Sequence, residues 1–239
     1  MINVVIPMAG LGTRFPREQY LPKPLIDVNG KPMIVRAIES LDIKGQYYFL
    51  VRKDEYTNII KSVIEKTVSN PQFIAVDKTT EGPACSVLLF KDSINNDQEL
   101  VVANCDQIME WSSELFFHNV RLYDGAVVTY YSDTDKNSYA RLDRKGLVVE
   151  MREKEVISNI SLNGIHYWKQ GRHFVQSAEA MIAADDRAPN GEFYIAPTYN
   201  YMIQSGLRVG IHHIPNEQHH PVGVPLDLER FLRYDQTKH

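Results

Sequence analysis

Near the start of the chain stands Asn3-Val-Val-Ile-Pro-Met-Ala-Gly-Leu-Gly-Thr-Arg-Phe15, an apolar run followed by two closely spaced glycines. The apolar run predicts a buried strand. Gly10 and Gly12 free the backbone of Cβ clashes, so that consecutive N–H groups are able to turn toward an anion. Arg14 adds a forked cation that suits phosphate oxygens. This stretch therefore predicts a phosphate-binding loop at the end of a strand.

Two well-known glycine loops do not match this pattern. The dinucleotide-binding pattern G-x-G-x-x-G would need glycine at Phe15, and a Walker loop would end in G-K-[ST], which does not occur here. A second cation follows at Lys23, between Pro22 and Pro24, which stiffen the chain on either side of it. Two cations close to a glycine loop are unfavourable without an anion, which favours a phosphate site.

Short apolar runs alternate with helical periods through the first half of the chain. Strands are predicted at 3–6, 47–51, 73–76 and 100–103, and helices begin near Met33, Tyr56 and Ala84. In the second half, strands are predicted at 126–131, 140–151 with a turn at 143–146, and 207–213, and helices at 174–184, 195–204 and 226–233. The pattern indicates an α/β fold, a three-layer αβα sandwich with a mixed, mostly parallel central sheet, in one domain over 1–239.

The composition is that of a globular protein without a nucleic-acid-binding surface. Of 239 residues, 44% are apolar and 23% are charged, and the net charge is −4. No apolar stretch approaches the length of a membrane span, and the first residues lack the features of a signal peptide. Cys85 and Cys105 suit neither a disulfide framework nor a zinc site. A cytoplasmic protein is expected.

Together these residues resemble the sugar-nucleotide pyrophosphorylase family, which consists of nucleotidyltransferases with a GT-A-like Rossmann fold. The family's opening signature is a strand, then G-x-G-T-R, then Pro-Lys-Pro-Leu; here these are residues 10–14 and 22–25, and the pattern continues through 27–33. Glu81–Ala84 resembles the family's second glycine loop, and Ala103–Gln107 resembles its magnesium-binding segment. Glu153-Lys154 resembles its acceptor element, and Asn163–Tyr167 resembles the strand beyond that element. The opening, the T-E-G-P-A loop and the N-x-D-Q segment are most similar to short cytidylyltransferases of bacterial capsule loci.

The resemblance implies transfer of NMP from a nucleoside triphosphate to a small phosphorylated acceptor, with release of pyrophosphate and with Mg²⁺ as the cofactor. The similarity to capsule-locus enzymes favours CMP from CTP, in the synthesis of capsule or surface polysaccharide. It also implies a nucleotide-binding half, 1–110, an acceptor-binding half, 111–239, and a possible homo-oligomer. Neither nucleic acid nor a membrane is expected as a partner.

The resemblance assigns roles to individual residues. Arg14 would hold the β- and γ-phosphates, Lys23 the α-phosphate and Lys154 the acceptor phosphate, so these three form the expected catalytic set. Asp106 would coordinate Mg²⁺ just beyond a strand end. The nucleotide-binding residues would be Met8, Ala9, Gly10, Leu11, Gly12, Thr13, Asp77, Glu81, Gly82, Pro83, Asn104 and Asp106. The acceptor-binding residues would be Glu153, Lys154, Gly164, Glu192 and Tyr194.

Two positions depart from the family's pattern. Many members carry a second metal-binding carboxylate near the C-terminus, where this chain has Pro221; Asp227 and Glu192 are the alternatives. Thymidylyl- and uridylyltransferases tend to carry Gln five residues before the second loop glycine, where this chain has Asp77. An ionised Asp only accepts hydrogen bonds, so it suits the exocyclic amine of cytosine, and next of guanine, rather than O4 of uracil or thymine.

Three other functions stay open on the sequence alone. A sugar-1-phosphate thymidylyl- or uridylyltransferase would carry the same signatures with another base. A catalytically inert nucleotide-binding subunit would explain the altered C-terminal segment. Glycosyl transfer would use the same fold, but the one Asp-x-Asp sequence of the chain, at 133–135, falls in a polar turn rather than at a strand end.

Overall fold

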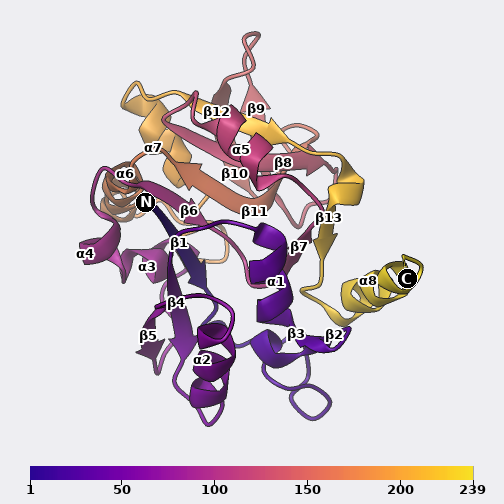
Figure 1. The fold of residues 1–239 in the computed structure, drawn as a ribbon. Helices are drawn as coiled ribbons and strands as arrows, with labels where there is room; N and C mark the ends of the chain where they lie inside the picture. Colours follow the sequence, from indigo (N-terminus) through magenta and orange to yellow (C-terminus); the bar gives the residue numbers. More distant parts are fainter. Residues whose placement is uncertain (239) are drawn as a thin grey trace.

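The computed structural model describes residues 1–238 and is organised around a nine-stranded sheet (Figure 1). Seven strands lie in the order β10-β9-β11-β6-β1-β4-β5, while β8 pairs with β11 and β12 pairs with β8. In chain order the strands are β1 (Ile2–Pro7), β4 (Gln46–Arg52), β5 (Gln72–Val76), β6 (Glu99–Val102), β8 (Gly125–Tyr131), β9 (Ser138–Leu142), β10 (Val148–Glu153), β11 (Ile160–Trp168) and β12 (Val209–His213).

The sheet is mixed, as the sequence predicts. β1 pairs in parallel with both β4 and β6, and β4 pairs in parallel with β5, so the first half of the chain forms a parallel block. β11 runs antiparallel to β6, β8 and β9 and joins this block to the second half. The predicted strand 140–151 is two antiparallel strands, β9 and β10, separated by the expected turn, in which Gly146 has a φ of +79°.

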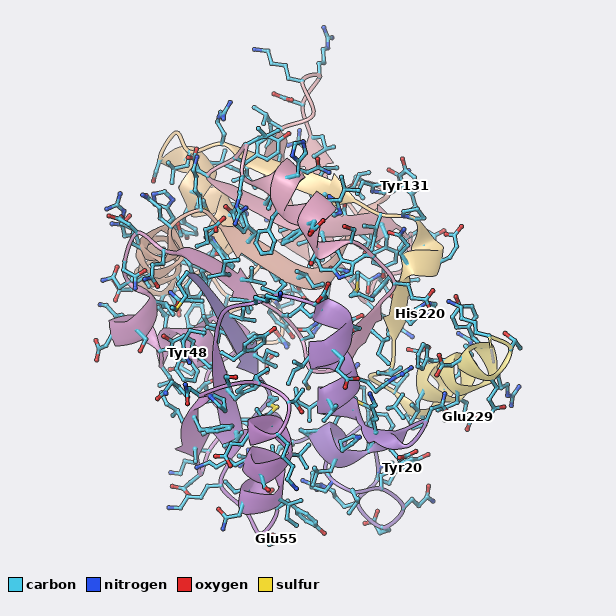
Figure 2. All side chains as sticks on the ribbon, viewed as in Figure 1. Tyr20, Tyr48, Glu55, Tyr131, His220 and Glu229 are labelled. Atoms are coloured by element: carbon cyan, nitrogen blue, oxygen red, sulfur yellow. The ribbon has the colours of Figure 1, made fainter. Side chains whose placement is uncertain are left out.

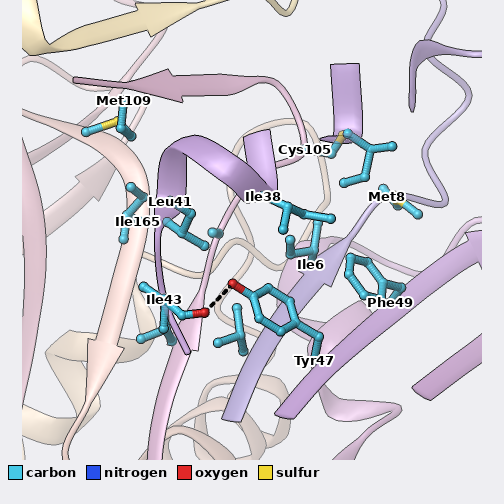
Figure 3. Close-up of a cluster of buried hydrophobic side chains, with 14 of the residues drawn as sticks. Ile6, Met8, Ile38, Leu41, Ile43, Tyr47, Phe49, Cys105, Met109 and Ile165 are labelled. Atoms are coloured by element: carbon cyan, nitrogen blue, oxygen red, sulfur yellow. Dashed lines mark hydrogen bonds between the residues drawn. The ribbon is translucent and has the colours of Figure 1, made fainter. Parts of the chain in front are cut away.

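Helices cover both faces of the sheet, which completes the predicted αβα sandwich. One face carries α1 (Met33–Leu41), α2 (Thr57–Glu65) and α5 (Ser113–Val120), and the other carries α3 (Pro83–Leu88), α4 (Lys91–Ile94), α6 (Gly171–Ala183) and α7 (Thr198–Gln204). Alternate residues of β1 pack against opposite helix layers. Val4 and Ile6 face the layer of α1, α2 and α5, here called the first layer, and Val5 faces the other. Figure 3 shows part of the first layer, where the buried Tyr47 hydroxyl donates to the Ile43 carbonyl at 2.8 Å. No helix within residues 1–238 combines the length and the apolar character needed to cross a bilayer.

The structure contains several elements that the sequence did not predict. Besides α4 and α5, they are the short helices η1 (Lys23–Leu25) and η2 (Asn216–Gln218), the hairpin of β2 (Asp27–Val28) and β3 (Lys31–Pro32), and the ribbon of β7 (Gln107–Met109) and β13 (His219–Pro221). The start of α5 does carry a local signal, because the Ser112 side chain accepts a hydrogen bond from the Leu115 amide at 3.1 Å. The β7–β13 ribbon joins segments about 110 residues apart and has no such signal.

The last helix, α8 (Pro225–Gln236), stands beside β13 at the right of Figure 1. Leu228 and Phe231 of α8 pack with Phe15 in a satellite core, and Arg36 of α1 pairs with Asp235 at 2.9 Å. His220 of β13 packs against α8 (Figure 2), with its ring centroid 4.6 Å from that of Tyr234. The C-terminal segment is therefore fastened to the glycine loop and to α1.

Candidate active site

The carboxyl ends of β1 and β6 lie at the same edge of the sheet, because these strands are parallel neighbours. The glycine loop leaves one strand end, the 103–106 segment leaves the other, and between them lies a cavity of about 400 Å³, here called the first cavity. Ten of the expected site residues line it, namely Ala9, Gly10, Arg14, Lys23, Gly82, Pro83, Asn104, Asp106, Glu192 and Tyr194.

A smaller cavity of about 220 Å³, the third cavity, opens over the glycine loop itself and is lined by Met8, Gly10, Gly12, Thr13, Arg14 and Lys23. Gly12 has a φ of +63°, which side chains rarely adopt, and its carbonyl accepts a hydrogen bond from the Phe15 amide at 2.9 Å. Phe15 is only 2% exposed and anchors the loop in the satellite core. The loop is therefore open to a ligand at its tip and fixed at its far end.

Lys23 and Asp106 form a largely buried ion pair at the edge of the first cavity. Burial alone would lower the pKa of Lys23, but the neighbouring Asp106 carboxylate and the Cys105 thiol hold that pKa above its ordinary value. Burial raises the pKa of Cys105 to about 11, so this residue is a neutral thiol at physiological pH. Lys23 is therefore a fixed cation at physiological pH.

Arg14 differs from Lys23 because its charge has no partner. Its side chain makes no hydrogen bond or ion pair with any other residue in 1–238. It lines the first and third cavities, and also a second cavity that lies beyond Asp106. Arg17, three residues later in the same loop, lies 3.9 Å from the Asp54 carboxylate instead. A free guanidinium above a glycine loop is suited to receive an anion.

The second glycine loop is locked to a segment from the other half of the chain. Gly82 has a φ of +138°, and a Cβ there would collide with the backbone oxygen and nitrogen of Phe193. The Phe193 amide donates to the Glu81 carbonyl at 2.8 Å, and the Ala84 amide donates to the Phe193 carbonyl at 3.0 Å. Arg187 adds an ion pair with Glu81 at 2.8 Å. The second loop and residues 187–194 are therefore held together by backbone hydrogen bonds and an ion pair.

A second cavity of about 450 Å³ lies beyond Asp106, between the start of β9, the end of β10 and the middle of β11. Lys154 lines this cavity directly after β10, in a left-handed conformation with a φ of +56°. Its ammonium group donates to the Tyr194 hydroxyl at 2.7 Å and lies 4.8 Å from the centre of the Tyr194 ring. The hydrogen bond to Tyr194 is the first cause that raises the pKa of Lys154.

Two further expected residues shape the second cavity. Glu153 accepts a hydrogen bond from Ser138, and burial raises the pKa of its carboxyl group above the ordinary value. Gly164 leaves room for the Asn104 amide, since a Cβ at this position would overlap the Asn104 nitrogen. Asn104 lines both cavities, so this contact positions a group that faces both ligand spaces.

The residues around Asp106 fit a hard cation such as Mg²⁺. The Asp106 carboxylate and the Asn104 amide offer oxygen donors between the two cavities, and the absent Cβ of Gly223 leaves the space in which Asp106 Oδ2 lies. Among residues 1–238 no group of three or more His, Cys, Asp or Glu side chains converges on a metal position. Magnesium often keeps several waters and uses one or two carboxylates together with substrate phosphates, which matches a site with one clear carboxylate.

Four expected residues line none of the three cavities, and the first of them, Leu11, is 56% exposed. The Asp77 side chain is 72% exposed and lies 3.6 Å from the Lys53 ammonium. Asp227 lies in the first turn of α8, 3.7 Å from Arg230, and Glu81 is held by Arg187. Of the two alternatives for a second metal ligand, Glu192 lines the first cavity and Asp227 lines none.

The sequence analysis missed polar residues that line the cavities. They are Thr79, Thr80 and Ser86 in the first cavity and Gln107, Lys136, Asn137, Ser138, Asn163 and His166 in the second. Thr79 and Thr80 precede the second glycine loop directly, and His166 lies within the segment 163–167 that resembles the family's strand. These three residues could therefore have been predicted as candidates from the sequence. Lys136, Asn137 and Ser138 enter through the β8–β9 connection, and no motif marks them.

Five residues line both the first and the second cavity, namely Arg14, Pro83, Asn104, Asp106 and Tyr194. Ligands in the two cavities would therefore meet beside Asp106. One side of this junction has a glycine loop, a free guanidinium and a buried ammonium group, and the other side has Lys154. The arrangement is suited to bringing two anionic molecules together.

Comparisons with curated proteins find relatives of greater length. The chain is 27% identical over 243 residues to the bifunctional protein GlmU of Methanococcus maripaludis (strain C7), covering 97% of this chain and 54% of that protein. It is 27% identical over 220 residues to the bifunctional protein GlmU of Clostridioides difficile (strain 630), covering 87% and 46%. The chain thus spans about half the length of the curated relatives it matches.

Comparisons with solved structures show the fold. A nucleoside-diphosphate-sugar pyrophosphorylase from Vibrio cholerae RC9 superposes with a TM-score of 0.83 at 23% identity, covering 96% of this chain and 99% of that one. A putative glucose-1-phosphate thymidylyltransferase from Bacillus anthracis gives a TM-score of 0.78 at 20% identity, covering 98% and 95%. A UDP-glucose pyrophosphorylase complexed with UDP-glucose gives 0.76 at 16% identity over the whole of both chains.

The family model described as Nucleotidyl transferase matches residues 3–199, which include both glycine loops, Asp106 and Lys154. This match covers most of the chain, and the solved structures with the same fold carry nucleotidyltransferase or pyrophosphorylase names. The chain belongs to the nucleotidyl transferase family.

Proposed function

We propose that this enzyme transfers NMP from a nucleoside triphosphate to a small phosphorylated acceptor and releases pyrophosphate. The triphosphate would occupy the first and third cavities, built mainly from residues 1–110, and the acceptor would occupy the second, built mainly from residues 111–239. The observation that carries the proposal is the junction of the two cavities at Asp106, with Arg14, Lys23 and Lys154 around it. Such a junction suits in-line attack of one phosphate on another.

The reacting groups are anionic, so the main task of the protein is to supply positive charge and N–H donors. The acceptor phosphate oxygen attacks the α-phosphorus, a new P–O bond forms, and the bond to the β-phosphate breaks. Backbone N–H groups of Gly10, Leu11 and Gly12 bind the leaving phosphates, and the unpaired Arg14 guanidinium holds the charge that develops on pyrophosphate. Lys23, kept charged by Asp106, faces the α-phosphate.

Lys154 acts on the other reactant. In the free protein its ammonium group donates to the Tyr194 hydroxyl, and this bond keeps the side chain at the cavity wall. The acceptor phosphate, which is the stronger hydrogen-bond acceptor, takes over this donor when it binds. Tyr194 lines both cavities, so the same hydroxyl lies near the point where the two substrates meet.

Mg²⁺ would be held by Asp106 together with phosphate oxygens of the nucleotide, with Glu192 as the candidate for a second protein ligand. When bound, the ion supplies charge neutralisation at the phosphates. Gly223 keeps the space at Asp106 clear, and the ion pair with the buried Lys23 ammonium group orients the carboxylate.

For the base we propose cytosine, with capsule or surface polysaccharide as the destination of the product. This proposal rests on the resemblance to capsule-locus cytidylyltransferases and on Asp77, which accepts hydrogen bonds but cannot donate them when ionised. The Asp77 carboxylate lies outside the first cavity beside Lys53, so it would have to turn inward when CTP binds.

Thymidylyl or uridylyl transfer is the competing function, and a specific observation favours it. Thr79 and Thr80 line the first cavity while Asp77 does not, and a hydroxyl is able to donate to O4 of uracil or thymine as well as accept. The names of the solved relatives, a glucose-1-phosphate thymidylyltransferase and a UDP-glucose pyrophosphorylase, point in the same direction.

The decisive experiment pairs each of CTP, UTP, dTTP, ATP and GTP with a panel of phosphorylated acceptors and follows pyrophosphate release with Mg²⁺ present. Because the relatives' names point to sugar phosphates, hexose 1-phosphates lead the panel, followed by phosphorylated polyols and phosphorylated amino-acid amides. Pyrophosphate release with at least one pair is the expected result. Nucleotide binding without turnover across the panel would favour an inert binding subunit.

Asp77→Ala separates the two bases. If Asp77 reads cytosine, this variant raises the KM for CTP about fivefold or more and leaves the KM values for UTP and dTTP unchanged. Asp97→Ala is the matched control, because Asp97 is also exposed and paired with a basic side chain, that of Arg172, at 2.6 Å. Equal turnover of wild-type enzyme with CTP and UTP would remove the preference for cytosine.

A further inference from the structure

The floor of the second cavity is an irregular part of β11. The pairing of β11 with β8 shifts register between Leu162 and His166, and Gly164 lies in this bulge with a φ of +95°. Bulges next to ligand sites change the direction of the side chains around them. Here they bring Asn163 and His166, from the middle of a buried strand, to the wall of the cavity.

His166 is held rigidly at this wall. The residue is 6% exposed, and its ring lies nearly parallel to the rings of Trp168 and Tyr199, at centroid distances of 5.9 Å and angles of 19° and 20°. Tyr199 is itself fixed, because its hydroxyl lies 3.1 Å and 3.2 Å from the carbonyls of Ala126 and Tyr167. The ring of His166 therefore has one stable position.

The two ring nitrogens of His166 have different surroundings. Nδ1 is fully enclosed and has no hydrogen-bond partner among residues 1–238, while the ring as a whole lines the second cavity. An enclosed N–H without an acceptor is rarer and less favourable than an enclosed lone pair. The proton of the neutral ring therefore belongs on Nε2, the nitrogen on the cavity side.

The imidazole is also neutral at physiological pH. Burial lowers the pKa of His166 to about 3, since no carboxylate compensates the loss of hydration. His166 thus offers a single neutral N–H donor in a cavity whose cations are Arg14, Lys136 and Lys154. A neutral donor suits an uncharged oxygen, such as a hydroxyl, ether or carbonyl oxygen.

We propose that His166 is an acceptor-binding residue, whose Nε2–H donates a hydrogen bond to an uncharged oxygen of the acceptor at some distance from its phosphate. This inference rests on the proposed function, because it assigns the second cavity to the acceptor. With Lys154 on the phosphate and His166 on a second oxygen, the acceptor is held at two points. An acceptor without that oxygen leaves the donor unpaired and binds less tightly.

Three substitutions test the hydrogen bond. The amide nitrogen of Gln extends to about the position of Nε2 and that of Asn to about the position of Nδ1, while Phe keeps a ring without a donor. We expect His166→Phe and His166→Asn to raise the acceptor KM about tenfold, and His166→Gln to stay within about threefold of wild type. The KM for CTP should be unchanged in all three, and thermal unfolding checks that each variant is folded.

The first probe is glucose 1-phosphate with CTP and Mg²⁺, replaced by the compound with the highest turnover in the panel if that is another one. If His166 only packs the core, the Gln and Asn variants should have the same acceptor KM when they are equally stable. The inference is overturned if His166→Phe keeps the wild-type acceptor KM, or if Asn substitutes for His166 as well as Gln does.

A second measurement needs no acceptor. In ¹⁵N-histidine NMR of the free protein at pH 7, the signal that disappears in His166→Gln should be that of a neutral ring protonated on Nε2. A ring protonated on Nδ1, or on both nitrogens, contradicts the inference. If no acceptor in the panel reacts, the proposed function fails. The NMR measurement still tests the inference separately, because it shows which nitrogen of His166 carries the proton.

Discussion

The first and second cavities are of similar size, but the chain builds them in different ways. The first lies where the parallel strands β1 and β6 end, and its groups come from two glycine loops and from Asp106. The second lies along the antiparallel strands β9, β10 and β11, and its groups come from strand ends, a bulge and the β8–β9 connection. Lys23 in the first is paired with a carboxylate, while Lys154 in the second is paired with a neutral phenol.

This difference follows from what each cavity would bind. A triphosphate is the same for many enzymes, and a loop of backbone N–H groups at a strand end holds it without specific side chains. An acceptor differs from enzyme to enzyme, and side chains on strands and connections are able to vary without disturbing the parallel core. The following predictions test whether the two cavities divide the work in this way.

The largest effect is expected in the first cavity, from Arg14→Ala. Removing the unpaired guanidinium should lower kcat about 10²–10³-fold, because it takes away a charge that stabilises the leaving pyrophosphate. Pyrophosphate release under saturating substrates measures the effect. Arg17→Ala is the control, since Arg17 lies in the same loop but faces Asp54, and it should stay within about twofold. Equal losses in both variants would contradict the role of Arg14.

The next effect tests the connection between the two halves. Gly82→Ala should destabilise the protein by about 3 kcal/mol or more, because the new Cβ meets the Phe193 backbone at a φ of +138°. Gly146→Ala also has a positive φ, +79°, but its Cβ meets no atom within 4 Å, so about 1 kcal/mol is expected. Urea unfolding of both variants measures the difference. Equal destabilisation would show that the contact with Phe193 does not matter.

A smaller effect is expected in the second cavity, from Lys154→Met. The acceptor KM should rise about tenfold, which is the effect of losing one hydrogen bond to a charged phosphate. The KM for the nucleotide should not change, because Lys154 does not line the first cavity. Arg152→Met is the control, since Arg152 is exposed and paired with Glu150 at 2.8 Å. A rise in the nucleotide KM would contradict the prediction that Lys154 acts on the acceptor alone.

The smallest effect concerns pH and the Lys23–Asp106 pair. Because the folded protein holds the pKa of Lys23 above the ordinary 10.5, the pair stabilises the fold fully below that pH and loses its effect as the pH rises through the higher value. The difference in unfolding free energy between wild type and Lys23→Met should therefore shrink at alkaline pH. Urea unfolding from pH 8 upward measures this difference, and a constant difference would contradict it.

Most of the fold could be predicted because its elements are amphipathic over several residues. Met33–Leu41 is a helix that begins at the predicted residue, since the residues at helical spacing all face the core. The turn at 143–146 was predicted from local residues, and Asp143 Oδ1 indeed accepts from the Lys145 amide at 2.8 Å. The ribbon of β7 and β13 was missed because three-residue strands that pair across about 110 residues leave no local pattern.

The candidate site, like the fold, could be predicted from the sequence only in part. Arg14, Lys23 and Asp106 do line one cavity. Arg14 and Asp106 lie in segments that follow parallel strand ends, as predicted, while Lys23 lies at the start of η1. Asp77 was assigned by counting back from Gly82, and counting along a chain cannot tell which way a loop side chain points. His166 was not predicted because its place at the cavity wall depends on the register shift in β11 and on stacking with Trp168 and Tyr199, and the sequence motif shows neither.

The contact between Asp106 and residues 222–223 has a consequence for the order of folding. The Val222 amide donates to the Asp106 carbonyl at 2.9 Å, and Gly223 packs against the Asp106 carboxylate, although the family pattern ends at residue 199. A nascent chain that has left the ribosome only as far as residue 200 already holds both glycine loops and most of the sheet. It still lacks Val222 and Gly223, so we expect Asp106 to reach its final position only after these residues have joined the fold.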